Sequence, residues 1–455
     1  MIKLTFAIAS AILIVAATPS SAQTLSIIHQ FGTTAGDPQN PSEPGVICQS
    51  RGGYLFSAGG TTGNAGAAFR VTTSSQYKIM HVFNGTDGQN PSGGLTLGRD
   101  GMLYGSTVSG GPGSWGILYK MSPAGTITRL HYFSGGNGGD PQASPIQSVA
   151  GDFYGVTHGS YNYGTIYKVS PYGEFSTIHS NAIGDGIYQV APLVQGTDFW
   201  FYGAAIDNAG TESPGDIYRI NSSSTFQTLY TFDGTIGYHP SGGLLQATDG
   251  NYYGVASGGG TNGAGTVFAM SRDHSAVWVV YNFTGGADGG TPVGGMIQAS
   301  DGNLYGTTYS GGSFGSGVLF RVTLGGTYTV RHDFSPAGGS GPRSALFQHT
   351  NGRIYGMTSA GGTKNEGVFF SFDDGLPPFV SYLPVYGSPG AEVEILGQGF
   401  TSSSEVYFNG IRANSTTVYS TYIKAFVPAG ATTGPITVVT GDVTLASNKS
   451  FNVQP

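Results

Sequence analysis

Four aspartates in glycine- and proline-rich loops have side chains that could do chemistry in this 455-residue sequence. They are Asp37, Asp87, Asp140 and Asp288, and each follows an apolar segment that ends in Phe. Carboxylate oxygens are the ligands that Ca²⁺ prefers, so the four acids are candidate calcium ligands, and no other cofactor is predicted. The alternative, which we favour, is that each Asp caps a turn of its own loop.

Aromatic residues interrupt a second set of loops that are otherwise rich in glycine. They are Trp115, Tyr161, Tyr163 and Phe314. Exposed aromatic rings stack on sugars or form the centre of a protein interface, so these four are candidate ligand-binding residues. They could instead fold inward and fill gaps between structural units, and the sequence leaves both interpretations open.

Histidines recur at a fixed place but do not form a metal-binding pattern. His29, His81, His131 and His332 each stand two residues before a Phe, and Tyr230 and Tyr281 occupy the same place elsewhere. A position that accepts both His and Tyr indicates packing rather than metal binding. The chain has no H-E-x-x-H motif, phosphate-binding loop or G-x-S-x-G elbow, so no catalytic residue is predicted.

The elements that position these loops are predicted by an internal repeat. Tyr-Gly pairs recur about every 50 residues, and a degenerate earlier copy spans 52–60. The pairs begin at Tyr104, Tyr154, Tyr202, Tyr253, Tyr305 and Tyr355. The sixth copy has four short apolar runs, at 294–298, 303–308, 317–322 and 328–334, which we expect to be strands a to d. Seven such copies predict a seven-bladed β-propeller.

The two ends of the repeat array complement each other. The last copy has apolar runs at 344–348, 353–358 and 367–372, and then lacks a fourth strand. The segment 25–31 matches the fourth-strand pattern of 128–133. We therefore expect the N-terminal strand to complete the last blade and close a propeller spanning 23–373, because ring closure removes exposed strand edges.

The repeat also resembles a known family. Its pattern D-G-x-L-Y-G-T-T-x-x-G-G, then G-x-V-F, then L-x-x-F-x-G, is similar to the bacterial Gloeo/Verruco (GloVer) tandem repeat. The resemblance covers about residues 25–373. It implies a propeller, and it implies no particular activity.

A different module follows the linker 374–378, at 379–455. Its apolar and polar residues alternate in "AEVEIL", which is typical of a half-buried strand. This part resembles an IPT/TIG immunoglobulin-like domain, which implies a small β-sandwich that acts as a spacer or contact module. The matching residues are Pro384, Gly387, Gly390, Gly397, Gly399, Phe400, Val406, Phe408, Gly410, Ala413, Ile423, Ala425, Val427, Pro428, Gly430 and Gly434.

Composition and the N-terminus narrow the cellular setting. Residues 1–22 have a lysine, an apolar run and small residues at their end, which indicates a signal peptide and a secreted protein in the periplasm, at the cell surface or outside the cell. With a net charge of −7 and only 18 Lys and Arg, nucleic-acid binding is not expected. No membrane span is expected after cleavage. Cys48, the single cysteine, is expected to be a buried, inert thiol.

The long loops suggest where function lies. The b–c and d–a connections, which share one face of a propeller, are longer than the a–b and c–d turns. Long loops on one face are where function usually resides. The sequence therefore predicts a non-catalytic binding or envelope-scaffold protein that meets a glycan or a protein at this face. The alternative is a carbohydrate-active enzyme, a polysaccharide lyase or glycosidase, and the oligomeric state is left open.

Overall fold

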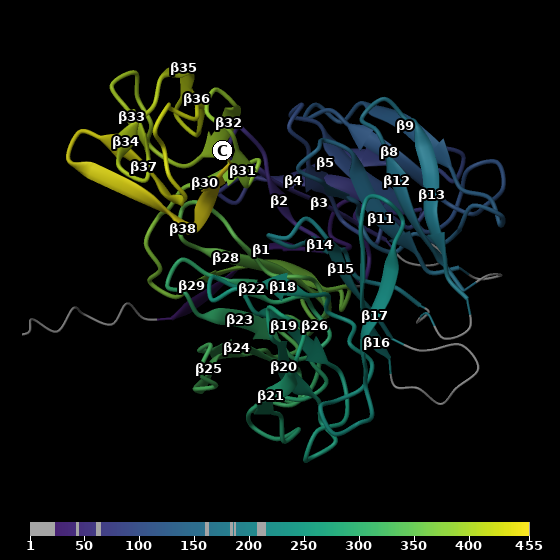
Figure 1. Cartoon of the computed structure of the whole chain (residues 1–455). Coiled ribbons are helices and arrows are strands. Elements are labelled where there is room, and N and C mark those ends of the chain that lie inside the picture. Colours follow the sequence, from purple (N-terminus) through teal and green to yellow (C-terminus); the bar gives the residue numbers. More distant parts are fainter. Residues whose placement is uncertain are drawn as a thin grey trace, which may run out of the picture.

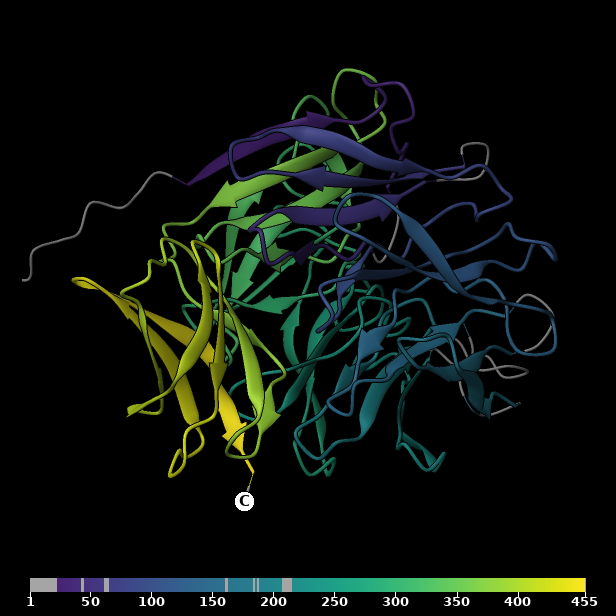
Figure 2. The ribbon, with the colours of Figure 1, turned by 90° about the horizontal axis from the view of Figure 1, so that it is seen from above.

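The computed structural model describes residues 23–41, 45–60, 65–159, 163–182, 185, 188–206 and 215–454. This part of the chain contains β-strands and no α-helix. Seven sheets of short antiparallel strands follow one another round a ring, and two further sheets form a C-terminal sandwich. Figure 2 shows the ring, with the purple first strand lying beside the green last sheet. The prediction of a seven-bladed propeller followed by an immunoglobulin-like sandwich is confirmed.

The first three blades each contain four consecutive strands, labelled a to d from the centre of the ring outward. Blade 1 is β2 (Cys48–Gln49), β3 (Leu55–Gly59), β4 (Ala67–Val71) and β5 (Tyr77–Val82). Blade 2 is β6 (Thr96–Leu97), β7 (Leu103–Thr107), β8 (Ile117–Met121) and β9 (Ile127–Tyr132). Blade 3 is β10 (Ile146–Gln147), β11 (Phe153–Thr157), β12 (Thr165–Val169) and β13 (Phe175–Ser180).

The next three blades repeat this order. Blade 4 is β14 (Val194–Gln195), β15 (Phe201–Ala205), β16 (Asp216–Ile220) and β17 (Phe226–Thr231). Blade 5 is β18 (Leu245–Gln246), β19 (Tyr252–Ala256), β20 (Thr266–Met270) and β21 (Val277–Asn282). Blade 6 is β22 (Ile297–Gln298), β23 (Leu304–Thr307), β24 (Val318–Val322) and β25 (Tyr328–Asp333).

Blade 7 takes strands from both ends of the repeat array. Its inner strands are β27 (Phe347–Gln348), β28 (Ile354–Ala360) and β29 (Val368–Asp373), and a short strand, β26 (Ser340–Pro342), pairs with the end of β28. The outer strand is β1 (Thr24–Gln30), which pairs antiparallel with β29 from Thr24 opposite Asp373 to Gln30 opposite Val368. Phe31, which is fully buried, follows β1 into the core between blades 7 and 1.

The recurring Tyr-Gly pair holds each blade to its neighbour. In blade 6 the Tyr305 hydroxyl donates to the Asp301 carboxylate 3.0 Å away, which ties strand b to the a–b turn. Tyr104 stacks on Phe153 of the next blade with ring centroids 3.8 Å apart. The glycine leaves room for an aromatic ring of strand c, because a Cβ on Gly306 would lie 2.5 Å from Cζ of Phe320. The repeat therefore supplies a cap for the a–b turn, a contact with the next blade and a close approach of strands b and c.

A belt of glutamine amides runs round the ring on strand a. In blade 6 the Gln298 carbonyl oxygen accepts from the Thr248 N–H of blade 5 at 2.9 Å, and its amide donates to the Gly302 carbonyl at 2.9 Å. The same place holds Gln49, Gln147, Gln195, Gln246, Gln298 and Gln348. Gln49 joins blade 1 to blade 7, because its side-chain oxygen accepts from the Thr350 N–H at 3.1 Å. Blade 2 has Leu97 at this place, so the belt is interrupted between blades 1 and 2.

The C-terminal sandwich has a four-stranded and a five-stranded sheet. The first contains β30 (Ser381–Leu383), β32 (Glu392–Leu396), β36 (Tyr422–Phe426) and β35 (Ser415–Tyr419). The second contains β31 (Tyr386–Gly387), β38 (Val443–Val453), β37 (Gly434–Thr440), β33 (Glu405–Phe408) and β34 (Ile411–Arg412). Its own buried core includes Val393, Ile395, Phe408, Ile436 and Phe451. Figure 1 shows these strands gathered on one side of the propeller.

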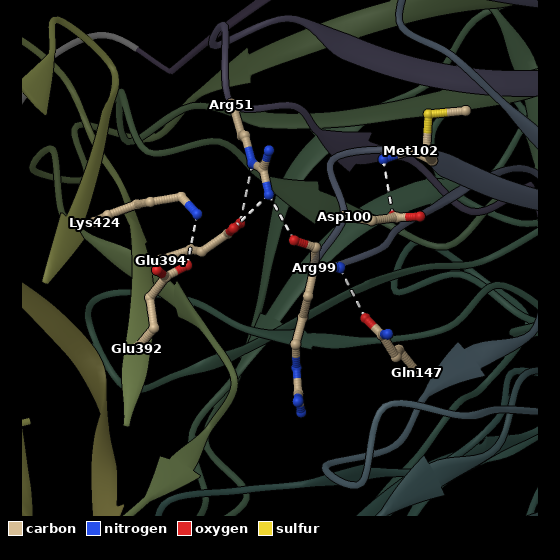
Figure 3. Close-up of polar contacts among 8 residues, drawn as sticks. All are labelled: Arg51, Arg99, Asp100, Met102, Gln147, Glu392, Glu394 and Lys424. Carbon is tan, nitrogen blue, oxygen red and sulfur yellow. Dashed lines mark hydrogen bonds and ion pairs between the residues drawn. The ribbon is translucent and has the colours of Figure 1, made fainter. Parts of the chain in front are cut away.

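The sandwich docks on the a–b turns, over the gap in the amide belt. Leu396 and Tyr422 pack into the same apolar cluster as Leu97. Beside them, Arg51 of blade 1 donates from Nε to the Glu394 carboxylate at 3.1 Å and from its terminal nitrogen to the Arg99 carbonyl at 2.5 Å (Figure 3). Leu97, which stands where the other blades have glutamine, thus belongs to the apolar surface on which the second domain rests.

A buried histidine at the boundary between blades 7 and 1 indicates that acid destabilises the folded chain. His349 is fully buried, accepts at Nδ1 from the Asn351 N–H at 3.1 Å, and therefore donates from Nε2 to the Gly53 carbonyl at 3.0 Å. Burial lowers its pKa, and it also lowers the pKa of His131, His158, His274 and His332. The unfolded chain therefore takes up protons first as the pH falls.

We expect the free energy of unfolding to decrease as the pH falls below about 6.5 and through the lower pKa of the folded state. Urea unfolding at pH 7.5 and pH 5 measures this change. His349→Gln, which removes one of these titrating groups, should flatten the pH dependence. A stability that rises on acidification between these values would contradict the prediction.

Candidate functional site

The face made by the b–c and d–a loops presents aromatic side chains to solvent. Phe314, in the b–c loop of blade 6, is 63% exposed, and Tyr163, in that of blade 3, is 40% exposed. Trp115 is half-buried, because its ring lies over the glycines of the next loop, 3.4 Å from the position of a Cβ on Gly135 and 2.7 Å from one on Gly139. Tyr161 lies outside the described residues. Trp115 therefore follows the gap-filling interpretation, whereas Phe314 and Tyr163 remain candidates for ligand contact.

Two further aromatic residues on this face were not predicted. Tyr309 is 38% exposed, with the Arg343 guanidinium 4.3 Å from its ring centroid, and Tyr238 of the d–a loop before blade 5 is 37% exposed. A signal for Tyr309 exists in the repeat. The corresponding place at the end of strand b holds Val108, His158, Ile206, Ser257, Tyr309 and Ser359. Such variation in size and polarity at one place of the repeat indicates a side chain that the fold itself does not need.

Three of the four candidate aspartates cap the turn that follows strand d. Asp87 accepts from the Asn84 N–H at 2.9 Å, and its other oxygen is 2.8 Å from Nε2 of His81. Asp37 makes the same contacts with the Thr34 N–H and His29, both at 2.9 Å. Asp288 repeats the arrangement with Thr284 N–H and the Tyr281 hydroxyl, also both at 2.9 Å. The acids thus bind the His or Tyr that the repeat places two residues before Phe.

The pKa values agree with this capping role. Burial opposes ionisation of Asp37, but hydrogen bonds from His29 and from the Thr34 N–H outweigh it and lower its pKa. Burial likewise opposes ionisation of Asp288, and the hydroxyl and N–H of Thr284 and the Tyr281 hydroxyl lower its pKa. Both carboxylates are therefore held ionised by their own loop.

Asp140 occupies a different place in its loop from the other three acids. Asn137 is the residue that contacts His131 there, at 3.0 Å, whereas Asp140 precedes Pro141 with a φ of 53°. Burial raises the pKa of Asp140. The four acids lie at different blade boundaries, and the described residues contain no group of three or more His, Cys, Asp or Glu side chains arranged to hold a metal ion.

The centre of the ring is lined by amides rather than by acids. Strand a of every blade is described, and none of its residues is Asp or Glu. The glutamine side chains are used in interblade hydrogen bonds, as described above. Cys48 on strand a of blade 1 is 8% exposed, and burial raises the pKa of its thiol. A thiol held protonated in this way is a poor nucleophile.

Comparison with known families decides the identity of the repeat. The sequence model of the Gloeobacter/Verrucomicrobia repeat matches residues 43–251 and 234–382. The chain belongs to the Gloeobacter/Verrucomicrobia repeat family. The IPT/TIG domain matches residues 377–453, which contain the C-terminal sandwich. Both resemblances predicted from the sequence are confirmed, and no curated protein matches the chain.

Solved structures support the fold of this repeat protein and no more. One is the extracellular domain of the putative hybrid two-component system BT3049 from B. thetaiotaomicron, with a TM-score of 0.51 and 10% identity. That match covers 95% of the present chain, which spans 58% of the other chain. Another is a fungal alcohol oxidase of the AA5 family in complex with copper, with a TM-score of 0.50 and 12% identity over 92% of this chain and 98% of that one. The described part of the chain has no helix of a length and apolarity that would cross a membrane.

The docked IPT/TIG domain makes the two faces of the propeller unequal. It contacts the a–b turns of several blades, through Thr421 to the Arg51 carbonyl at 2.7 Å and Gln398 to the Thr350 hydroxyl at 2.9 Å. Further round the ring, Asn448 donates to the backbone carbonyl of Gln298 in blade 6 at 3.3 Å. The domain therefore covers the a–b side of the ring centre, and the long loops lie on the opposite face.

Proposed function

We propose that this chain is a secreted, non-catalytic binding protein whose long-loop face receives a glycan or a protein. The observation that carries the proposal is the docking of the IPT/TIG domain on the a–b face, which leaves the exposed aromatic residues of the long loops on the side that the domain does not cover. Secretion rests on the leader-like residues 1–22, which lie outside the described residues. The amide-lined ring centre supports a binding role, because a glycosidase needs a pair of carboxyl groups beside its substrate.

The IPT/TIG domain has a structural part in this proposal. It rests on the gap in the amide belt, and it contacts a–b turns of blades 1, 4 and 7. In this way it braces the propeller on one side while the other side meets the ligand. The turn-capping aspartates hold the bases of the long loops through hydrogen bonds within each loop.

Substitution of Phe314 tests the proposal. Phe314→Ala removes an aromatic ring that is 63% exposed, so the fold should be unaffected while ligand binding weakens about tenfold or more, as expected for a residue central to a contact surface. Binding is measured on residues 23–455 with a glycan array and an envelope pull-down, each with and without Ca²⁺.

The matched control is Tyr172→Ala in the c–d turn of blade 3. Tyr172 is 90% exposed but belongs to the face opposite the long loops, so its loss should leave binding unchanged. Equal effects of the two substitutions, or binding that persists in Phe314→Ala and is lost in Tyr172→Ala, would contradict the assignment of the face.

A further inference from the structure

A groove lies between the a–b turns of blades 3 to 5 and the IPT/TIG domain. It consists of two adjoining pockets, of about 290 and 480 Å³. The pockets share Gln195, Thr197, Val385 and Asn452 in their walls. Sites for small molecules have volumes of this order and occur preferentially between domains. The groove is separate from the long-loop face, because it is built from the opposite ends of the strands.

The smaller pocket contains an aromatic residue in a strained conformation. Phe199 has a φ of 71°, in the left-handed region that disfavours residues with a side chain. The other six blades have glycine at this place of the turn, also with positive φ: Gly53, Gly101, Gly151, Gly250, Gly302 and Gly352. Phe199 is 42% exposed and contacts Tyr386 of the IPT/TIG domain edge-on, with centroids 4.9 Å apart. Backbone strain kept at one repeat of seven, in a pocket wall, indicates a function for this ring.

The larger pocket contains two cations. Arg272 and Lys449 both line it, and neither forms an ion pair within the described residues. The Lys449 ammonium is 3.4 Å from the Gln246 carbonyl of blade 5. Asp249 also lines the pocket, but its carboxylate accepts from the Tyr253 hydroxyl at 2.8 Å and from the Asn251 side chain at 3.0 Å. The two cations therefore outnumber the single acid of the wall.

The backbone of Lys449 is held in place by hydrogen bonds within the sandwich. The register of β37 and β38 shifts between Pro435 and Thr437, and Ser447 and Lys449 lie in the irregular part of β38 opposite this shift. The Ser447 and Tyr382 hydroxyls both donate to the Lys449 carbonyl, at 2.6 and 3.0 Å. The side chain is exposed within the groove, yet its ammonium lies against the propeller, where desolvation lowers its pKa. An anion beside it would offset that desolvation.

We propose that the groove binds an anionic oligosaccharide, with one sugar ring against Phe199 and Tyr386 and its acidic group between Arg272 and Lys449. Aromatic rings offer a flat apolar surface for the C–H face of a sugar, and Arg and Lys make charge-assisted hydrogen bonds to carboxylate or sulfate. The aromatic rings of the smaller pocket favour a sugar over an acidic peptide, and the walls around Phe199 and Thr248 are turns, to which a peptide backbone does not pair as it does to a strand.

The test measures binding of small probes to residues 23–455 by isothermal titration calorimetry. The probes are trigalacturonate, its neutral methyl ester, a sulfated trisaccharide and triglutamate. We expect one or both acidic trisaccharides to bind, and the neutral ester to bind at least about tenfold more weakly. Binding of neither acidic trisaccharide, or equal binding of triglutamate, would overturn the proposal.

Three substitutions locate the site. Lys449→Met and Arg272→Gln should each weaken the acidic probe about tenfold, and Lys78→Met, an exposed lysine of blade 1, should not. Phe199→Gly restores the glycine of the other blades, so the folded chain should be at least as stable while the probe no longer binds. Loss of stability together with unchanged binding in Phe199→Gly would show that the ring serves domain docking alone, and it would overturn the proposal. Binding lost in Phe314→Ala instead would place the sugar on the long-loop face and overturn it as well.

Discussion

Removal of residues 23–31 is expected to open the ring and lower the free energy of unfolding by at least about 5 kcal/mol. β1 supplies the outer strand of blade 7, so its loss breaks every backbone pairing between Thr24–Gln30 and β29. Phe31 leaves the core between blades 7 and 1, and burial of one such side chain contributes about 1.5–3 kcal/mol. Each lost hydrogen bond adds about 0.5–1.5 kcal/mol.

The truncated chain should also associate with itself. β29 would become an unpaired edge, and it contains Phe369, Phe370 and Phe372, which are all buried in the intact blade. Exposed edges of this kind pair with other chains. Size-exclusion chromatography and urea unfolding of the chain starting at residue 32 measure both effects.

The matched control starts at residue 23 and retains all of β1. It should unfold at the same urea concentration as the chain with its first 22 residues. Phe31→Ala gives a smaller change that keeps β1 in place, and it should cost about 3–5 kcal/mol because the side chain is fully buried. A truncated chain that stays monomeric and as stable as the control would show that β1 is dispensable for closure.

The fold could be predicted from the sequence because each blade repeats the same local chemistry. Asp301 with Tyr305, and Gly306 beside Phe320, recur in recognisable form, and strand pairing within a blade is between neighbours in sequence. The role of most of the loop aspartates could also be predicted from the sequence. For Asp37, Asp87 and Asp288 the role as a turn cap follows from local spacing, and the structure adds that the His or Tyr of strand d is the second partner.

The site could be predicted only in part, because exposure depends on contacts between distant segments. Trp115 and Phe314 interrupt similar loops, yet Trp115 is half-buried because its ring packs against Gly135 and Gly139 of the next loop. Phe199 was not predicted, although the repeat marks it as an exception, since every other blade has glycine there. The place of Lys449 could not be deduced, because it depends on how the IPT/TIG domain docks, and that contact joins residues 203 positions apart.

Glu394→Gln is expected to weaken docking of the IPT/TIG domain by about 2–4 kcal/mol. Glu394 is 4% exposed on β32, and its carboxylate receives both the Nε and a terminal nitrogen of Arg51. Breaking one partner of a buried pair leaves the other charge uncompensated, which costs about 3–5 kcal/mol when both are buried. Arg51 is 31% exposed, so water relieves part of this cost. Urea unfolding should show an earlier, separate transition, and small-angle scattering should show a larger radius of gyration.

Glu392 on the same strand provides the matched control for this prediction. Its carboxylate is 42% exposed and receives the Lys424 ammonium at 2.6 Å, away from the propeller (Figure 3). Because exposed pairs contribute about 0.2–1 kcal/mol, Glu392→Gln should leave the scattering profile unchanged. Replacing both Arg51 and Glu394 by Met should recover much of the docking, since Leu97, Leu396 and Tyr422 already surround the pair with apolar surface. If the double variant docks no better than Glu394→Gln, the apolar contact does not hold the domains together, and the ion pair itself carries the interface.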